Sequence, residues 1–140
     1  MYIDDLNGTG AAKYPGRWHS KGTYMLYTAA TPALALLESV VHISGIPAQD
    51  YCMLCLEIPD DNILIISEKS LPNNWYNNPF PSSLAQIGDR FIQQNEYFAL
   101  QLPSAIMPED CNILINPNHK DFGKVNVVYK RSIPIDKRLL

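Results

Sequence analysis

The sequence lacks long hydrophobic runs, a secretory signal and an excess of basic charge. No apolar stretch approaches the roughly 20 residues that a membrane-spanning helix needs. Residues 1–5 contain neither the basic start nor the apolar segment of a secretory signal. The formal net charge of −3 argues against a general affinity for nucleic acid, which requires a basic surface. These absences predict a cytoplasmic protein with no membrane span and no nucleic-acid partner.

Cysteine is also scarce, since the chain of 140 residues has three. An odd number without a secretory signal does not indicate a disulfide framework. Cys52 and Cys55 have the CxxC spacing of zinc and redox motifs, but they fall in an apolar run that predicts a buried strand. Side chains three positions apart on a strand point to opposite faces, so these sulfurs cannot share a metal ion. We therefore predict no metal site and a packing role for both cysteines.

The composition is that of a folded globular domain. Apolar residues make up 46% of the chain and charged residues 18%, which excludes extended disorder. The length suits a single domain over residues 1–140. Charge is uneven, because residues 1–119 hold five basic and twelve acidic side chains and residues 120–140 hold six basic and two acidic. The basic end fits a solvated last strand, which we favour, or contact with a phosphate or an acidic partner.

The order of predicted elements indicates an α+β domain with few helices and mixed or antiparallel sheets. Strands are predicted at residues 23–29, 51–58, 62–66, 97–102, 112–115 and 124–133. One helix is predicted at 32–43, with Thr31 as its N-cap and Pro32 at its first position, and another at 82–94, capped by Ser82 or Ser83. Residues 4–22 and 71–83 are predicted loops. Too few helices separate the strands for a doubly wound parallel sheet.

Two polar side chains in predicted loops are candidates for ligand contact. Arg17 lies in a polar segment between glycines, where a planar guanidinium suits phosphate. A surface arginine stacked on Trp18 explains the same pattern equally well. Ser104 interrupts the end of a predicted strand, where its hydroxyl fits either a ligand contact or a turn cap.

Glu38 is the single formal charge of the helix predicted from Pro32. It lies at the edge of a broad apolar arc, one turn before His42. A carboxylate at such an edge can be half-buried, which makes its interactions tunable. The alternative is a narrow solvent stripe of Glu38, Ser39 and His42, and helical spacing alone favours that stripe.

Several different short segments, spread in order along nearly the whole chain, together match the pattern of a known family. They are residues 8–12, 16–22, 26–29, 33–38, 103–105 and 112–117, together with His42 and His119. This ordered set resembles the RES domain family, the toxins of Xre–RES toxin–antitoxin systems. The family is named for an arginine, a glutamate and a serine, and Arg17, Glu38 and Ser104 stand at those motif positions.

The resemblance implies a fold similar to ADP-ribosyltransferase toxins, with NAD as substrate and no prosthetic group. Such toxins cleave the nicotinamide–ribose bond of NAD by hydrolysis or phosphorolysis, or transfer its ADP-ribose to a protein. The resemblance implies that Glu38 stabilises the cation-like sugar and that Arg17 binds the diphosphate or the ribose phosphate. Tyr27 is expected to orient nicotinamide, and Ser104 to add a hydrogen bond near it. An Xre-type helix-turn-helix antitoxin is expected to block the site.

The start of the sequence departs from this family pattern. The family usually has an opening strand with a Tyr-Arg-like segment, whereas residues 1–5 stand almost directly before the glycine-rich segment here. We expect that strand to be missing. This leaves an alternative function, a catalytically weak domain that binds NAD or a protein partner without turnover.

Overall fold

A computed structural model describes residues 6–42 and 50–140 of the chain. The helices and strands, in chain order, are α1 (Thr9–Lys13), β1 (Leu26–Ala29), α2 (Pro32–Val40), β2 (Tyr51–Glu57), β3 (Ile63–Ile65), α3 (Ala85–Gln94), β4 (Ala99–Pro103), β5 (Cys111–Ile115) and β6 (Asn126–Ile133). Short 3₁₀ turns lie between them, including one at Ser82–Leu84 that leads into α3.

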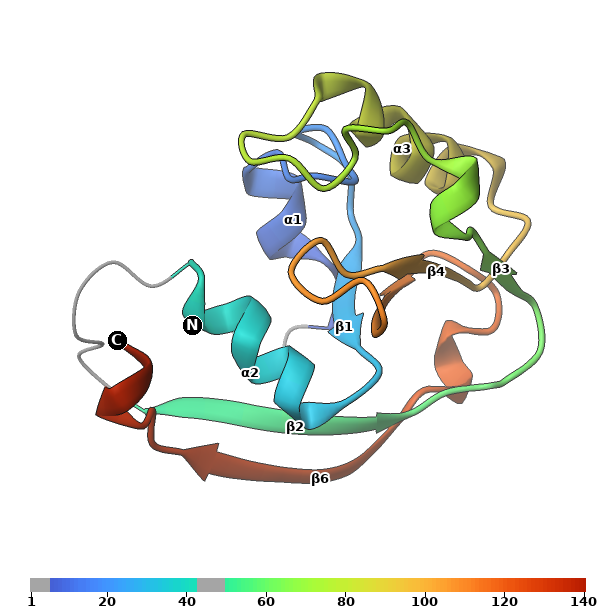
Figure 1. Ribbon diagram of the computed structural model, residues 1–140. Helices are drawn as coiled ribbons and strands as arrows, with labels where there is room; N and C mark the ends of the chain where they lie inside the picture. Colours follow the sequence, from blue (N-terminus) through green and yellow to red (C-terminus); the bar gives the residue numbers. More distant parts are fainter. Residues whose placement is uncertain (1–5, 43–49) are drawn as a thin grey trace.

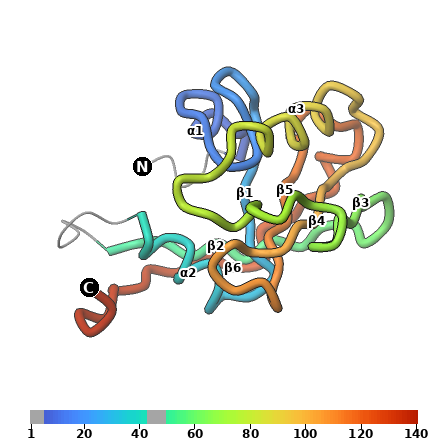
Figure 2. The backbone as a smooth tube through the Cα atoms, turned by 45° about the horizontal axis from the view of Figure 1, so that its top comes forward, coloured from blue at the N-terminus to red at the C-terminus, as the bar shows by residue number. Residues whose placement is uncertain are grey.

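The strands form two separate sheets. Four of them make one sheet in the order β1–β5–β4–β3, which Figure 2 shows from one edge to the other. Neighbours are antiparallel except β3 and β4, which are parallel. Strands β2 and β6 pair antiparallel as a two-stranded ribbon, called the ribbon below. Figure 1 shows α2 lying along the ribbon at the bottom of the view and α3 at the top.

The register of the four-stranded sheet decides which side chains share a face. Tyr27 is opposite Leu114, and Ala29 is opposite Asn112. Paired residues project to the same face, and so do residues two apart on one strand. Tyr27, Asn112 and Leu114 therefore share one face, called the site face below.

Apolar side chains cover both faces of this sheet. On the site face, fully buried Leu100, Leu102 and Leu114 pack with Trp18 and Trp75. The other face holds a smaller cluster built on Phe98, Ala99 and Ile115. The larger cluster also includes Leu84 and Phe91, so α3 and its preceding turn form part of the cover.

The loop that carries Arg17 is fixed to α3. A Cβ atom at Gly88 would lie 1.7 Å from the Trp18 carbonyl oxygen, so only glycine permits this close approach. Next to it, Asp89 accepts hydrogen bonds from Ser20 N (2.9 Å) and from Thr23 Oγ1 (2.8 Å). Burial on its own raises the pKa of Asp89, but these hydrogen bonds outweigh it and hold that pKa below its usual range.

The predicted class, an α+β fold with few helices and mixed sheets, is confirmed. The N-terminus of α2 is also as predicted, because the Thr31 side chain accepts a hydrogen bond from Leu34 N and Pro32 is the first helical residue. The helix ends at Val40, earlier than predicted. Residues 43–47, where the sequence signals its end, lie outside the described residues, as do residues 1–5.

Several other predictions are wrong in instructive ways. Strand β1 begins at Leu26 instead of residue 23, because its partner β5 ends at Ile115, opposite Leu26. The predicted loop at 4–22 contains α1. Neither Ser82 nor Ser83 caps α3, since both belong to the 3₁₀ turn before it.

The runs at 51–58 and 62–66 are consecutive strands along the chain, as predicted, and they belong to different sheets. Strand β2 is half-buried instead of buried, because among the described strands it pairs only with the exposed β6. No helix within residues 6–42 and 50–140 combines the length and the apolar character that crossing a bilayer requires.

Candidate active site

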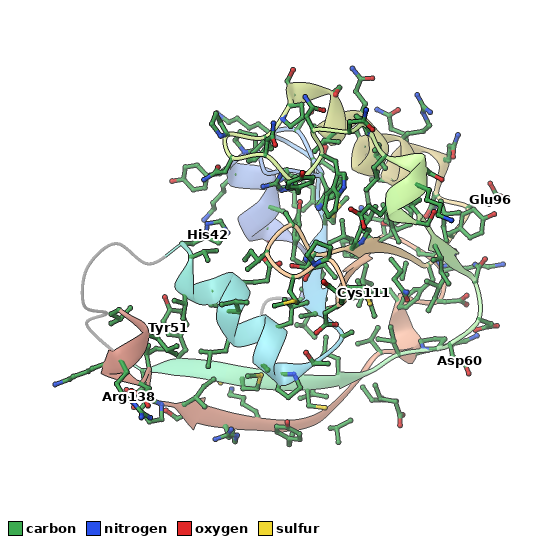
Figure 3. All side chains as sticks on the ribbon, viewed as in Figure 1. His42, Tyr51, Asp60, Glu96, Cys111 and Arg138 are labelled. Atoms are coloured by element: carbon green, nitrogen blue, oxygen red, sulfur yellow. The ribbon has the colours of Figure 1, made fainter. Side chains whose placement is uncertain are left out.

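Glu38 is half-buried on α2 and is held by two donors. Its Oε1 accepts hydrogen bonds from Ser104 Oγ (2.9 Å) and from Asn112 Nδ2 (2.9 Å). The first turn of α2 is tied to the same region, since Thr31 Oγ1 donates to Asp110 Oδ2 (2.8 Å). The solvent-stripe interpretation is therefore wrong for Glu38. Of that stripe, His42 is exposed, and Figure 3 shows it at the C-terminal end of α2.

Ser104 is fully buried directly after β4. Its hydroxyl donates to Glu38 and accepts from Ile106 N (3.1 Å) and Met107 N (3.2 Å). One donor and two acceptor positions are all that a hydroxyl offers. Ser104 is thus both a turn cap and a support for Glu38, and the geometry places it behind the carboxylate.

Asn112 is the second residue that binds Glu38, and the sequence did not single it out as a site residue. It lies on the site face of β5, paired with Ala29 on one side and Leu102 on the other. Its neighbours in the strand are apolar. A lone amide in an apolar strand was the available signal, because a buried polar group needs a specific partner. Figure 3 labels Cys111, the residue before it, near the connection between β4 and β5.

Arg17 is half-buried and is bound to the loop at 71–83. Its Nη1 donates to the carbonyl oxygens of Trp75 (2.7 Å) and Asn77 (3.0 Å), and its guanidinium lies 5.0 Å from the centre of the Phe80 ring. Burial lowers the pKa of Arg17, while the negative charge of Glu38 acts in the opposite direction. The two side chains therefore lie within electrostatic range of each other. Stacking on Trp18 is excluded, because Trp18 is in the core and Phe80 is the ring beside Arg17.

Tyr27 has an exposed ring and an inward-pointing hydroxyl. The hydroxyl lies 2.5 Å from Nδ1 of His19, which is buried. His19 Nε2 lies 2.8 Å from the carbonyl oxygens of Ala11 and of Tyr14. Carbonyls only accept, so the neutral ring carries its proton on Nε2, and Nδ1 accepts from Tyr27. Burial of the hydroxyl raises the pKa of Tyr27.

Glycine is required beside this pair. A Cβ atom at Gly16 would lie 2.6 Å from His19 Cε1 and 3.3 Å from the Tyr27 hydroxyl. The glycines around Arg17 thus do more than mark a loop, because one of them leaves the space in which His19 orients Tyr27.

The four predicted site residues come from four different segments, and two of them, Glu38 and Ser104, are in direct contact. Ser104 binds Glu38, and Glu38 interacts electrostatically with Arg17. Tyr27 shares the site face with Asn112, which also binds Glu38. A hollow of about 490 Å³ lies elsewhere, in an apolar space between β1, α2 and the ribbon. Of the four, only Tyr27 borders it, so the hollow is not the candidate site.

Potential metal ligands do not gather in the described part of the chain. Residues 6–42 and 50–140 hold no group of three or more His, Cys, Asp or Glu side chains placed to bind an ion. Cys52 and Cys55 are free and half-buried in β2, which corrects their predicted place in a buried strand.

Comparisons with known proteins show the class to which this α+β fold belongs. The RES domain profile matches residues 2–136. "Toxin Res" of Photorhabdus laumondii subsp. laumondii is 38% identical over 143 residues, which cover 99% of this chain and 91% of that protein. The "Prs ADP-ribosylating toxin" of a Sphingobium species is 35% identical, covering 98% of this chain and 88% of that protein.

A solved structure supports the fold. A chain in the crystal structure of the M. tuberculosis MbcT–MbcA toxin–antitoxin complex superposes with a TM-score of 0.78, at 14% identity, over 95% of this chain and 79% of that one. At such low identity the likeness concerns the fold alone. With the profile match and the relatives, it confirms the predicted resemblance, and the chain belongs to the RES domain family.

Proposed function

We propose that this protein is the toxin of a toxin–antitoxin pair and that it acts on NAD by cleaving the nicotinamide–ribose bond. The observation that carries the proposal is the half-buried Glu38 carboxylate, held by two donors within electrostatic range of Arg17. A fixed anion within electrostatic range of a fixed cation suits a substrate whose ribose gains positive charge while its diphosphate remains negative. The relatives named as toxins support the same function.

In the proposed reaction, Glu38 stabilises the cation-like ribose and Arg17 binds the diphosphate or the ribose phosphate. The bond between ribose C1′ and the nicotinamide nitrogen breaks, and its electron pair leaves with nicotinamide, which becomes neutral. The sugar carbon then bonds to an acceptor oxygen, whose proton passes to solvent. Tyr27 offers the face of its exposed ring to nicotinamide, since its hydroxyl is engaged by His19. Ser104 supports Glu38 from behind.

The acceptor oxygen decides the reaction type. Water gives hydrolysis, phosphate gives phosphorolysis, and a side chain of another protein gives ADP-ribosyl transfer. The relative named as a Prs ADP-ribosylating toxin favours a protein acceptor. We propose transfer to a protein first and hydrolysis or phosphorolysis second.

The proposed partner is an antitoxin of the Xre helix-turn-helix type that covers the site. The similarity of the fold to a chain of a toxin–antitoxin complex supports an antitoxin, and the family resemblance supports the Xre type. We place the activity in the cytoplasm. We expect a small helix-turn-helix protein to be encoded next to this chain, and adding it at equimolar ratio is expected to inhibit NAD consumption. An unchanged rate, or no complex by size-exclusion chromatography, contradicts this partner.

The activity is tested by incubating the purified protein with NAD in buffer, in buffer with inorganic phosphate, and in cell lysate with adenine-labelled NAD. Nicotinamide release is expected, and the fate of the label identifies the acceptor. Glu38→Gln is expected to slow release by at least about 100-fold, because it removes the charge that stabilises the transition state. Glu57→Gln is the matched control, since Glu57 is an exposed carboxylate on the ribbon.

No nicotinamide in any of the three conditions contradicts the proposed function. Equal rates for Glu38→Gln and the unmodified protein contradict the role of Glu38. Binding of NAD by calorimetry without consumption in any condition instead supports the alternative, a domain that binds without turnover.

A further inference from the structure

Both donors to Glu38 bind the same oxygen. Ser104 Oγ and Asn112 Nδ2 each lie 2.9 Å from Oε1. One donor fixes the distance of a carboxylate but lets it rotate about its last bond. A second donor arriving from another segment also fixes that rotation, and therefore decides which way the second oxygen, Oε2, points.

The two donors differ in how firmly the backbone holds them. Ser104 is in the turn that follows β4, whereas Asn112 is in the middle of the sheet, where β5 pairs with both β1 and β4. A side chain on a strand paired on both sides is positioned more accurately than one on a turn. The amide has to present its nitrogen to Glu38, because a carboxylate is an acceptor only.

We propose that Asn112 is a positioning residue for the reaction: it fixes the rotation of the Glu38 carboxylate so that Oε2 faces the ribose of the bound substrate. This inference rests on the proposed function and adds to it a residue outside the arginine, glutamate and serine for which the family is named. Asn112 acts through Glu38, to which one of its two amide N–H groups donates. It therefore contributes to the rate of bond cleavage more than to the binding of NAD.

The test compares steady-state NAD cleavage by the unmodified protein, Asn112→Ala and Asn112→Asp. The alanine variant removes the donor, and the aspartate variant keeps the shape but puts an acceptor against Glu38. Loss of one charge-assisted hydrogen bond is expected to lower kcat by about 10-fold to 100-fold while KM changes by less than about 3-fold. The aspartate variant is expected to be the slower of the two, since two acceptors then face each other.

Asn126→Ala is the matched control. Asn126 Nδ2 also donates to a glutamate, Glu57 Oε1 (3.4 Å), but both residues are exposed on the ribbon. This variant is expected to keep kcat and KM within about 2-fold of the unmodified protein, as surface substitutions usually do. A fall in kcat for Asn126→Ala equal to that for Asn112→Ala overturns the proposal, because the effect then does not depend on Glu38.

A second measurement separates this inference from the proposed function. Urea unfolding of the unmodified protein, Asn112→Ala, Glu38→Ala and the double variant gives the coupling between the two side chains without using NAD. Asn112→Ala is expected to raise the equilibrium constant for unfolding in the unmodified protein. In the Glu38→Ala background, that increase is expected to be about 3-fold to 100-fold smaller.

The outcomes are distinct. If the unmodified protein cleaves NAD and Asn112→Ala keeps its kcat, or changes only KM, the positioning role is wrong and the proposed function stands. If the unmodified protein cleaves no NAD, the proposed function is wrong and the reaction-linked role falls with it. The unfolding cycle then still shows whether Asn112 holds Glu38, and additive effects of the two substitutions exclude even that contact.

Discussion

The site face and the ribbon both carry polar side chains, but they hold them differently. On the site face, Glu38 receives two hydrogen bonds from residues distant in sequence, and fully buried leucines lie under it. On the ribbon, β6 is exposed along nearly its whole length, and its exposed side chains include Val127, Val128 and Tyr129. The difference shows that a motif indicates chemistry only where other elements fix its side chains. The cysteines of β2 have the CxxC spacing of a metal motif, yet they join no group of metal ligands among the described residues. Asn112 was given no role from the sequence, yet it contacts the Glu38 carboxylate.

The largest expected difference between the two regions is the stability lost when an apolar side chain is shortened. Leu114 is fully buried under the site face, so Leu114→Ala is expected to lower the free energy of unfolding by about 2–5 kcal/mol. Val128 on the ribbon is 60% exposed, and Val128→Ala is expected to change it by less than about 0.5 kcal/mol. Urea denaturation measures both. Similar losses for the two variants would mean that the ribbon is as well packed as the sheet.

The second contrast uses two glycines that differ in their surroundings. Gly88→Ala is expected to cost about 1–3 kcal/mol of stability, because the new methyl group overlaps the Trp18 carbonyl and pushes α3 off the loop that carries Arg17. Nothing lies within 4 Å of a Cβ atom at Gly10, so Gly10→Ala in α1 is expected to be neutral or slightly stabilising. Thermal unfolding compares them, and equal melting temperatures would refute the close approach of α3.

The third prediction concerns the link between Tyr27 and His19. Tyr27→Phe removes the hydroxyl that donates to His19 Nδ1 and leaves that buried nitrogen without its partner. The expected loss is about 1 kcal/mol in the free energy of unfolding. Tyr14 is 74% exposed, and Tyr14→Phe is expected to stay within about 0.5 kcal/mol of the unmodified protein. If the two variants are equally stable, the hydrogen bond between Tyr27 and His19 does not contribute to the stability of the fold.

The smallest predicted effect is a pH dependence at Asp89. Its folded-state pKa is held below the ordinary value of 3.8, so the carboxylate contributes stability above that value and loses the contribution as the pH falls through the folded-state pKa. The effect is expected to be below about 1 kcal/mol, since the group is partly solvated. Asp89→Asn is expected to flatten the stability profile between about pH 5 and pH 2. Asp60 is exposed, and Asp60→Asn is the control. An equally flat stability profile for this variant would show that Asp89 is not the source of the pH dependence.

The sequence predicted local signals well and long-range placement less well. Thr31 followed by Pro32 located the start of α2, because capping depends on neighbouring residues. The wheel of α2 placed Glu38 at the edge of an apolar arc but did not reveal that it faces Ser104 and Asn112. Those contacts join residues 66 and 74 positions apart, which no local pattern encodes. The family resemblance supplied Arg17, Tyr27, Glu38 and Ser104, and it included Asn112 in the segment 112–117 without giving it a role.

Sheet membership was beyond local reasoning for a similar reason. Apolar runs at 51–58 and 62–66 have the composition of strands, and composition does not say which strand each one pairs with. Strand β3 pairs in parallel with β4, while β2 pairs with β6 near the other end of the chain. The half-burial of Cys52 and Cys55 follows from that pairing. A prediction of burial from an apolar run alone assumes a neighbour that β2 does not have.

The distance along the chain between Glu38 and its two supports has a consequence for how the protein is made. Ribosomes deliver the carboxylate first, and the side chains that hold it follow 66 and 74 residues later. At a synthesis rate of about 5–20 residues per second, several seconds separate the two events. A nascent or prematurely released chain that ends before residue 104 therefore has the acidic group without either of its supports. The contacts around Glu38 are therefore complete only when translation is nearly finished, and a partial product of translation lacks them.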